Sequence, residues 1–322
     1  MKNKAITIFL ISIAIIIVVV VTFDFSSTKR GKGPENPYEF NVEEFKSVDP
    51  SLVKYRETKQ IRVNAEMPHG IVCHGDTIYL IADSFLQSFE ISGKQLLRVT
   101  FEKEPYCLDV MENENIAIGF RNSIAILNST GKILKNSIVE NYKAIYTSLA
   151  VNGNSIYVAD AGNRKVVIFN ENAEKTAEFS GESGVTDKYG FIIPSPYFDL
   201  DFNNTGELWI VNPGLHALQN YSDNGKLRGY WENSSITIEG FSGCCNPAHF
   251  TFLPDGDFVT SEKGLVRIKV YNPAGELKAV VAPPQKFAED GHAPDLTADK
   301  KGNIYALDFN KKLIRVFTPT QE

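Results

Sequence analysis

The chain has 322 residues, of which 43% are hydrophobic and 22% charged, and its formal net charge is −6. This length allows one large domain or two ordinary ones, and the composition is that of a globular protein. The acidic balance and the scattered lysines and arginines argue against a nucleic-acid partner, because phosphate recognition needs a concentrated basic surface.

An apolar segment near the N-terminus predicts a membrane anchor. Residues 5–23 are 19 uncharged positions in a row, about the number needed to cross ~30 Å of hydrocarbon. A cleaved signal peptide has a shorter apolar core and small residues at its cleavage site, whereas this run ends in Val21-Thr22-Phe23. We expect an uncleaved signal anchor, and a cleaved signal peptide is the alternative.

The charges that flank this segment leave its orientation open. Lys2 and Lys4 precede it, and Lys29, Arg30 and Lys32 follow it, so the positive-inside rule does not decide. An anchor at the start of a chain most often exports the large part that follows, which favours a periplasmic or extracellular domain. The predicted order is a cytoplasmic N-terminus at 1–4, a transmembrane signal anchor at 5–23, a flexible tether at 24–50 and a folded domain at 51–322.

One sequence pattern recurs six times in the folded domain. Most copies open on a proline, and each continues with a strand, a Gly or Asn turn and a second strand, which usually carries an aromatic residue. The equivalent positions in the second strand are 38, 40, 52, 50 and 46 residues apart, at Tyr79, Ala117, Tyr157, Trp209, Val259 and Tyr305. A strand-filled period of about 40–50 residues is typical of propeller blades. We expect an all-β, six-bladed β-propeller.

The sixth copy ends after only three strands, because the chain stops at Glu322. A short strand-like segment at 59–63 precedes the first copy and can supply the missing fourth strand. Such a closure would pair both terminal edges, which would otherwise be open templates for association. The sequence therefore predicts a ring that an N-terminal strand closes.

The third copy, Val158-Ala-Asp-Ala-Gly-Asn-Arg-Lys-Val-Val-Ile-Phe169, resembles the centre of an NHL repeat, and Gly302-Asn-Ile-Tyr-Ala-Leu-Asp308 is a second, weaker match. The resemblance covers about residues 60–322 and is eroded in the first two copies. It implies a binding platform, as in most NHL-type propellers, or less often an enzyme. Asp160 and Asn163 match the hydrogen-bonding positions of the repeat, so we expect a structural role for them.

Three insertions precede the fourth, fifth and sixth copies, at 181–194, 232–245 and 283–293. In a propeller these connections share one face with the loops that follow each second strand. Insertions in a repeat array tend to mark the binding side. We expect this face to bind a protein, peptide or glycan near the membrane, and we favour binding over catalysis.

Histidines suggest a second hypothesis, a metal-dependent lyase or hydrolase like the amidating-lyase relatives of the repeat family. Four of the five histidines map to the insertion-bearing face, and imidazoles that converge near a channel can bind a metal. The candidate ligands for a divalent metal are His69, His249, His216 and Cys107. No pair has metal-binding spacing, and a histidine on a loop is more often a hydrogen-bonding residue, so no cofactor is firmly expected. A weaker hypothesis is a calcium site in the channel, formed by Asp199, Asp295 and Asn212. Lactonase-type propellers, which resemble this fold, hold calcium there, but their early glutamate motif is not evident in this sequence.

Adjacent cysteines mark the second insertion. The end of the second strand in the same copy should lie beside them, so thiols, an amide, an imidazole, a carboxylate and an ammonium would share one patch. The predicted ligand-binding residues are Cys244, Cys245, Asn246, His249, Glu262 and Lys263. The alternatives are a purely structural turn with solvated charges, or a redox role for the cysteine pair. Of the other cysteines, Cys73 occupies an apolar core position. Four cysteines are an even number, which an oxidising compartment permits.

The anchor can be tested by fractionation. We expect the protein in the membrane fraction, released by detergent but not by salt or carbonate, because a 19-residue apolar run partitions into lipid. N-terminal sequencing of the recovered protein should find the start of the chain intact. A soluble mature chain that begins near Asp24 would contradict the prediction.

Overall fold

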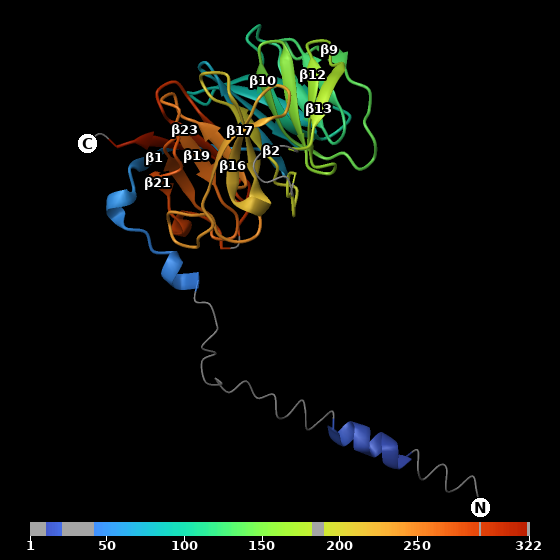
Figure 1. The fold of residues 1–322 in the computed structure, drawn as a ribbon, viewed down its shortest axis with the longest axis vertical. Coiled ribbons are helices and arrows are strands. Elements are labelled where there is room, and N and C mark those ends of the chain that lie inside the picture. Colours follow the sequence, from blue (N-terminus) through green and yellow to red (C-terminus); the bar gives the residue numbers. More distant parts are fainter. Residues whose placement is uncertain (1–10, 21–41, 182–189, 290, 321–322) are drawn as a thin grey trace, which may run out of the picture. The chain divides into compact units, whose positions relative to one another are not determined.

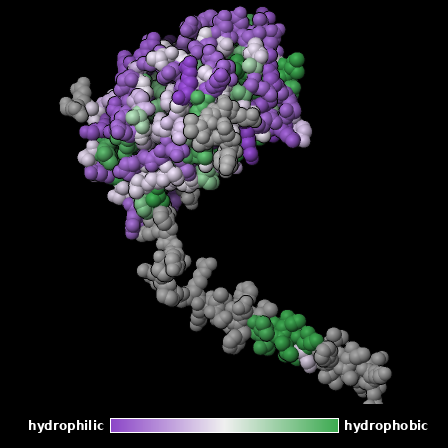
Figure 2. Space-filling view, in the orientation of Figure 1, coloured by the Kyte–Doolittle hydropathy of each residue, from purple (hydrophilic) through white to green (hydrophobic). Residues whose placement is uncertain are grey.

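The computed structural model describes residues 11–20, 42–181, 190–289 and 291–320. The chain divides into two compact units, Met1–Val42 and Glu43–Glu322. In the first unit, residues 11–20 form a helix that is apolar apart from Ser12 (Figure 2). No helix within the described ranges is long and apolar enough to cross a membrane. The remainder of the predicted anchor, at 5–10 and 21–23, lies outside the described residues, as does the tether from 24 to 41.

The second unit is a six-bladed β-propeller, as the repeat predicted. Its described residues contain 24 strands in six four-stranded antiparallel sheets (Figure 1). In five sheets the chain runs from the channel outward, and in the sixth the outermost strand comes from the start of the domain. Each innermost strand contacts the innermost strands of both neighbouring blades. Figure 2 shows that the visible face of this unit is largely hydrophilic.

The strands fall into blades in chain order. Blades 1 and 2 contain β2 (Pro68–His74), β3 (Thr77–Ala82), β4 (Phe85–Glu90), β5 (Gln95–Thr100), β6 (Pro105–Val110), β7 (Ile116–Phe120), β8 (Ile124–Leu127) and β9 (Ile133–Asn136). Blades 3 and 4 contain β10 (Tyr146–Asn152), β11 (Ser155–Asp160), β12 (Lys165–Asn170), β13 (Lys175–Phe179), β14 (Leu200–Phe202), β15 (Leu208–Asn212), β16 (Ala217–Tyr221) and β17 (Leu227–Glu232). Blades 5 and 6 contain β18 (His249–Phe252), β19 (Phe258–Ser261), β20 (Ile268–Tyr271), β21 (Leu277–Ala282), β22 (Asp295–Ala298), β23 (Ile304–Asp308), β24 (Leu313–Pro319) and β1 (Tyr55–Arg62).

Four short 3-10 helices complete the described elements. They are η1 (Val42–Phe45), η2 (Pro50–Leu52), η3 (Pro213–Leu215) and η4 (Pro284–Lys286). In η2, η3 and η4 a proline stands in the first turn, where its missing N–H costs no hydrogen bond.

The hydrophobic core is divided among the six blade interfaces. Middle strands such as β7 and β8 are buried along their whole length, because each blade packs its two faces against two neighbours. Outer strands such as β5 are mostly exposed, and β9 is exposed throughout. Between blades 3 and 4, for example, Tyr157 and Ile168 pack with Leu200 and Ile210. Six such apolar clusters, one for each interface, hold the described ring together.

The ring closes as predicted. Strand β1 pairs antiparallel with β24, and Ile61 lies opposite Ile314. A buried ion pair reinforces this seam: the Arg315 guanidinium donates to Glu57 at 2.7 and 2.9 Å and to Asp308 at 3.2 Å. The bonds from Arg315 outweigh burial and lower the pKa of Glu57. One N-terminal strand thus ties both ends of the propeller.

Truncation tests this closure. A chain that begins at residue 64 lacks β1, so it exposes the edge of β24 and leaves Arg315 without Glu57. We expect denaturant unfolding to show a loss of about 3–5 kcal/mol, which is typical when one partner of a buried ion pair is removed. A chain that begins at residue 42 keeps β1 and is the control. Equal stability of the two truncations would contradict the closure.

Candidate functional site

The innermost strands β2, β6, β10, β14, β18 and β22 surround a cavity of about 260 Å³. Each of these segments has a buried apolar residue, and the residue before it lines the cavity. The six cavity-lining residues at this equivalent position are Gly70, Cys107, Ser148, Asp199, His249 and Asp295. Four of the six, Ser148, Asp199, His249 and Asp295, therefore place polar side chains in one layer of the cavity.

Two carboxylates in this layer bridge neighbouring blades. Asp295 Oδ2 accepts the backbone N–H of Ile71 in blade 1 at 2.8 Å, and its Oδ1 accepts that of Leu296 at 3.0 Å. Asp199 does the same: its Oδ2 accepts the N–H of Phe250 in blade 5 at 2.9 Å, and its Oδ1 that of Leu200. Backbone donors thus fix the orientation of both carboxylates.

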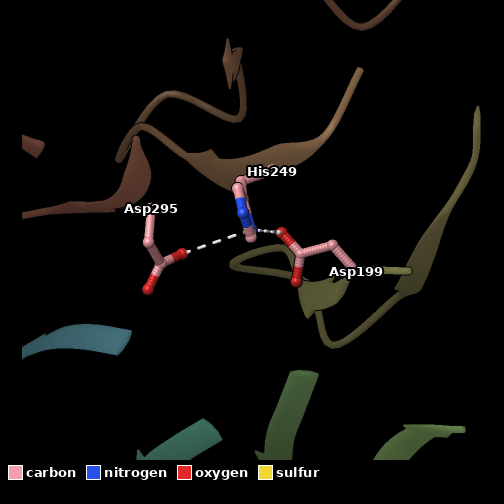
Figure 3. Close-up of side chains that lie close together, drawn as sticks. All are labelled: Asp199, His249 and Asp295. Atoms are coloured by element: carbon pink, nitrogen blue, oxygen red, sulfur yellow. Dashed lines mark ion pairs between the residues drawn. The ribbon is translucent and has the colours of Figure 1, made fainter. Parts of the chain in front are cut away.

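His249 lies between these two carboxylates (Figure 3). Its Nδ1 is 3.6 Å from Asp199 Oδ2 and 3.6 Å from Asp295 Oδ1. The ring packs edge-on against Tyr197, with centroids 5.6 Å apart. Burial lowers the pKa of His249, but the two carboxylates outweigh burial and raise it above its ordinary value. Burial also raises the pKa of Asp295 to about 6.

The three side chains have the geometry of a metal-ligand set. Their donor atoms lie within 4.8 Å of one another. The separations of 3.6 Å are longer than a hydrogen bond. They are close to the ~3.4 Å between two ligands of a tetrahedral ion with bonds of about 2.1 Å. One imidazole and two carboxylates suit a divalent cation of the zinc or manganese type, and the cavity leaves room for a further ligand.

A second acidic layer lies deeper in the same cavity. Asp109 Oδ2 accepts the N–H of Val151 at 2.8 Å, and Asp201 Oδ2 accepts the hydroxyl of Thr251 at 3.0 Å. Burial, together with the charge of Asp109, raises the pKa of Asp201 to about 8. Burial raises the pKa of Asp109 to about 6. The channel is therefore acidic along its depth, which favours cations over anions.

A histidine–carboxylate pair stands at the rim of the cavity. His69 Nε2 lies 2.8 Å from Glu104 Oε1, and the Tyr106 hydroxyl donates to Glu104 Oε2 at 2.8 Å. Burial acts to raise the pKa of Glu104, but the bonds from Tyr106 and His69 hold it below its ordinary value. An ionised carboxylate can only accept, so His69 Nε2 donates this hydrogen bond to Glu104, and Nδ1 is the ring nitrogen that takes no part in it.

Three of the four predicted metal ligands, His69, Cys107 and His249, line the same cavity, but the four do not form one group with ligand spacing. His249 belongs to the ligand set, and His69 lines the same cavity but pairs with Glu104. The His216 ring donates from Nδ1 to the carbonyl of Asn246 at 2.9 Å. Cys107 is buried in an apolar cluster between blades 2 and 3, and burial raises the pKa of its thiol. Within the described ranges, the group with ligand spacing is Asp199, His249 and Asp295.

Glu262, a predicted ligand-binding residue, is fully buried in an ion network. It pairs with Arg267 at 2.7 Å and with Lys269 at 2.8 Å, and neither cation has exposed side chain. Burial lowers the pKa of Lys269 to about 8. The two cations also donate to carbonyl groups at 236–240, and Glu262 accepts the N–H of Ser242. Glu262 therefore positions the second insertion and has no surface to offer a ligand.

The other predicted patch residues lie at the channel mouth. Asn246 and the backbone of Lys263 are joined by two hydrogen bonds, at 2.9 and 3.1 Å. The Lys263 ammonium is 3.4 Å from the Ser195 hydroxyl and 5.1 Å from the centre of the Tyr197 ring. Tyr197 in turn packs on His249. The strand adjacency that the sequence indicated is therefore present. Asp160 and Asn163 are joined at 2.7 Å, consistent with a structural role.

No protein-family model and no curated protein sequence matches this chain, whereas solved structures do. A streptogramin B lyase matches 84% of this chain and 100% of its own length, with 12% identity and a TM-score of 0.60. The virginiamycin B lyase of Staphylococcus aureus matches 84% of this chain and 90% of its own length, with 16% identity and a TM-score of 0.53. A protein of unknown function from Bacteroides thetaiotaomicron matches 82% of this chain and 72% of its own length, with 13% identity and a TM-score of 0.59. At such identities the likeness shows the propeller fold, which in general supports a binding platform.

A substitution at Glu262 tests the buried network. In Glu262→Gln, two buried cations lose their anion, so we expect unfolding in denaturant to require about 3–5 kcal/mol less free energy. Glu276→Gln is the matched control in the same blade: Glu276 is exposed and accepts a bond from Asn272 that glutamine can also accept. The network would lose its assigned role if both variants were as stable as the parent.

Proposed function

We propose that the channel binds a divalent cation through Asp199, His249 and Asp295 and that a small oxygen-bearing ligand completes the coordination from the cavity. The observation that carries the proposal is the placement of His249 Nδ1 at 3.6 Å from both carboxylates. Backbone N–H groups orient both carboxylates, as the hydrogen-bond partners of ligand side chains do in metal sites. Three protein ligands and an open position are typical of catalytic rather than structural sites.

The same cavity supports a reaction class, a metal-assisted lyase. A divalent cation at the three ligands would polarise a carbonyl oxygen of the ligand and so acidify the adjacent C–H bond. His69, which Glu104 holds in one tautomer, can take that proton on Nδ1. As the C–H electron pair forms a C=C bond, the C–O bond on the neighbouring carbon would break and its oxygen would leave as the carboxylate of the opened ester. The solved structures similar to this chain include two lyases, but their likeness extends to the fold alone. The lyase proposal therefore depends on the two histidines in one cavity.

Cation binding is the direct test. We expect titration calorimetry with Mn²⁺ to show one site in the full-length protein. His249→Ala should weaken binding at least about tenfold, since even outer-shell changes cost 10–100-fold. His292→Ala is the matched control, because His292 is exposed and lies outside the ligand set. Binding that survives His249→Ala unchanged would refute the site.

A panel of small cyclic and linear esters with Mn²⁺ tests the reaction class. A lyase opens the ester without adding water, so the product of a cyclic ester keeps the substrate's mass and gains no ¹⁸O from labelled water. His69→Ala should abolish turnover and leave Mn²⁺ affinity unchanged, whereas His249→Ala should lower both. Incorporation of ¹⁸O would indicate a hydrolase instead. If Mn²⁺ binds but no ester is turned over, the lyase proposal is wrong and the propeller acts as a binding platform.

We also propose the setting that the sequence suggests: an N-terminal anchor at 5–23 and an NHL-like propeller outside the cytoplasm. The support is the apolar run and the repeat pattern at 158–169. The insertion-bearing face, where the second insertion is held by the buried network of Glu262, would present the channel mouth to a protein, peptide or glycan near the membrane.

A further inference from the structure

Two thiols lie in contact at the end of the second insertion. Cys244 and Cys245 are both free, and their Sγ atoms are 3.2 Å apart. Cys244 is exposed, whereas Cys245 is 1% exposed. The first thiol is therefore accessible to a solute, and the second is close enough to attack whatever the first one binds.

Cys245 has the surroundings of a thiolate. Burial acts to raise its pKa, but hydrogen bonds from Ser195 and Cys244 and the charge of Lys263 outweigh burial and lower it. The Lys263 ammonium also lies 3.4 Å from Ser195 Oγ, so the two donors are next to each other. The remaining titratable neighbour is the phenol of Tyr197, whose pKa is raised by burial and by the charge of Cys245. A lysine beside a thiol is a usual cause of thiolate character.

The loop that carries the pair is held at both ends. Asn246 Nδ2 donates to the carbonyl of Ser242 at 2.6 Å and to that of Lys263 at 3.1 Å. Ser242 N in turn donates to the buried Glu262. Residues 242–246 are therefore fastened to the end of β19, and the thiols keep their place relative to Lys263. Cys245 is buried, but neither thiol belongs to one of the six apolar clusters between the blades.

We propose that Cys244 and Cys245 are a thiol–disulfide exchange site in which Cys244 attacks a small disulfide and Cys245 resolves the product. The Cys244 thiol gives its proton to water, and its thiolate attacks one sulfur of the small disulfide. The disulfide bond breaks, the first small thiolate leaves, and a mixed disulfide remains on Cys244. The Cys245 thiolate then attacks Cys244 Sγ and expels the second small thiolate. Two protein thiols are oxidised, and one small disulfide is reduced to two thiols.

The product is a disulfide between adjacent residues, which constrains its stability. Consecutive Cα atoms are about 3.8 Å apart, below the usual range of about 4.4–6.8 Å for disulfides, so the bond is strained and easily reduced. A reversible bond suits exchange better than structural reinforcement. Oxidation also removes the thiolate that Lys263 faces, so the mouth of the channel gains positive charge. This site does not depend on the proposed cation site.

Oxidised glutathione is the probe, and the full-length protein in detergent is the sample. We expect mass spectrometry to find a Cys244–Cys245 disulfide, two glutathione thiols released per chain, and reversal by excess reduced glutathione. Cys245→Ser should stop at one glutathione on Cys244. Cys244→Ser should react at least about tenfold more slowly, because the remaining thiol is buried. Both variants should melt within a few degrees of the parent.

Lys263→Gln separates this role from a structural one. It should prolong the mixed disulfide on Cys244 several-fold, because the resolving thiolate loses its cation, while the first step is unchanged. Lys226→Gln is the control, since Lys226 is exposed in blade 4. The proposal is overturned if the parent protein retains glutathione on Cys244, if the disulfide joins two chains, or if Lys263→Gln leaves the second step unaltered.

Discussion

Around the channel, backbone N–H groups of neighbouring blades need acceptors, because water is largely excluded between packed blades. In this propeller, side chains of the inner strands supply several of them. Asp295 accepts from blade 1 and Asp199 from blade 5, while Asp109 accepts from blade 3 in the layer below. These bonds fix the spacing of the blades and at the same time concentrate carboxylates in the channel. The ring and the acidic cavity therefore have one physical origin.

The cost of this arrangement is charge repulsion, and the channel relieves it in two ways. Protonation is one: the pKa of Asp201 rises to about 8. A positive partner is the other: His249 lies between Asp199 and Asp295. A divalent cation would relieve the repulsion more fully than an imidazolium, since it carries twice the charge. The network of Glu262, Arg267 and Lys269 has an excess of positive charge, because it contains two cations and one anion. Carbonyl groups of the second insertion accept hydrogen bonds from the cations and so stabilise the unbalanced charge.

The sequence predicted the ring because its period and its unpaired strand are visible along the chain. It named His249 as a metal ligand and Asp199 and Asp295 as weaker calcium candidates, but it did not join the three into one set. The reason is that the distance from the opening proline varies: Pro196 precedes Asp199 by three positions, Pro247 precedes His249 by two, and Pro294 is adjacent to Asp295. Counting from the proline therefore misaligns the blades. Counting from the buried apolar residue of each inner strand would have aligned them. The burial of Glu262 could not be predicted from the sequence either. Its two ion-pair partners, Arg267 and Lys269, lie on the next strand segment and meet Glu262 only in the folded blade.

The central claim is that carboxylates which join the blades also hold a cation with His249. The most direct test is an anomalous diffraction map from crystals of the propeller grown with Mn²⁺. We expect one strong peak within coordination distance of Asp199, His249 and Asp295, with both backbone hydrogen bonds to the carboxylates retained. A map without a peak there, or with the cation bound only elsewhere, would contradict it.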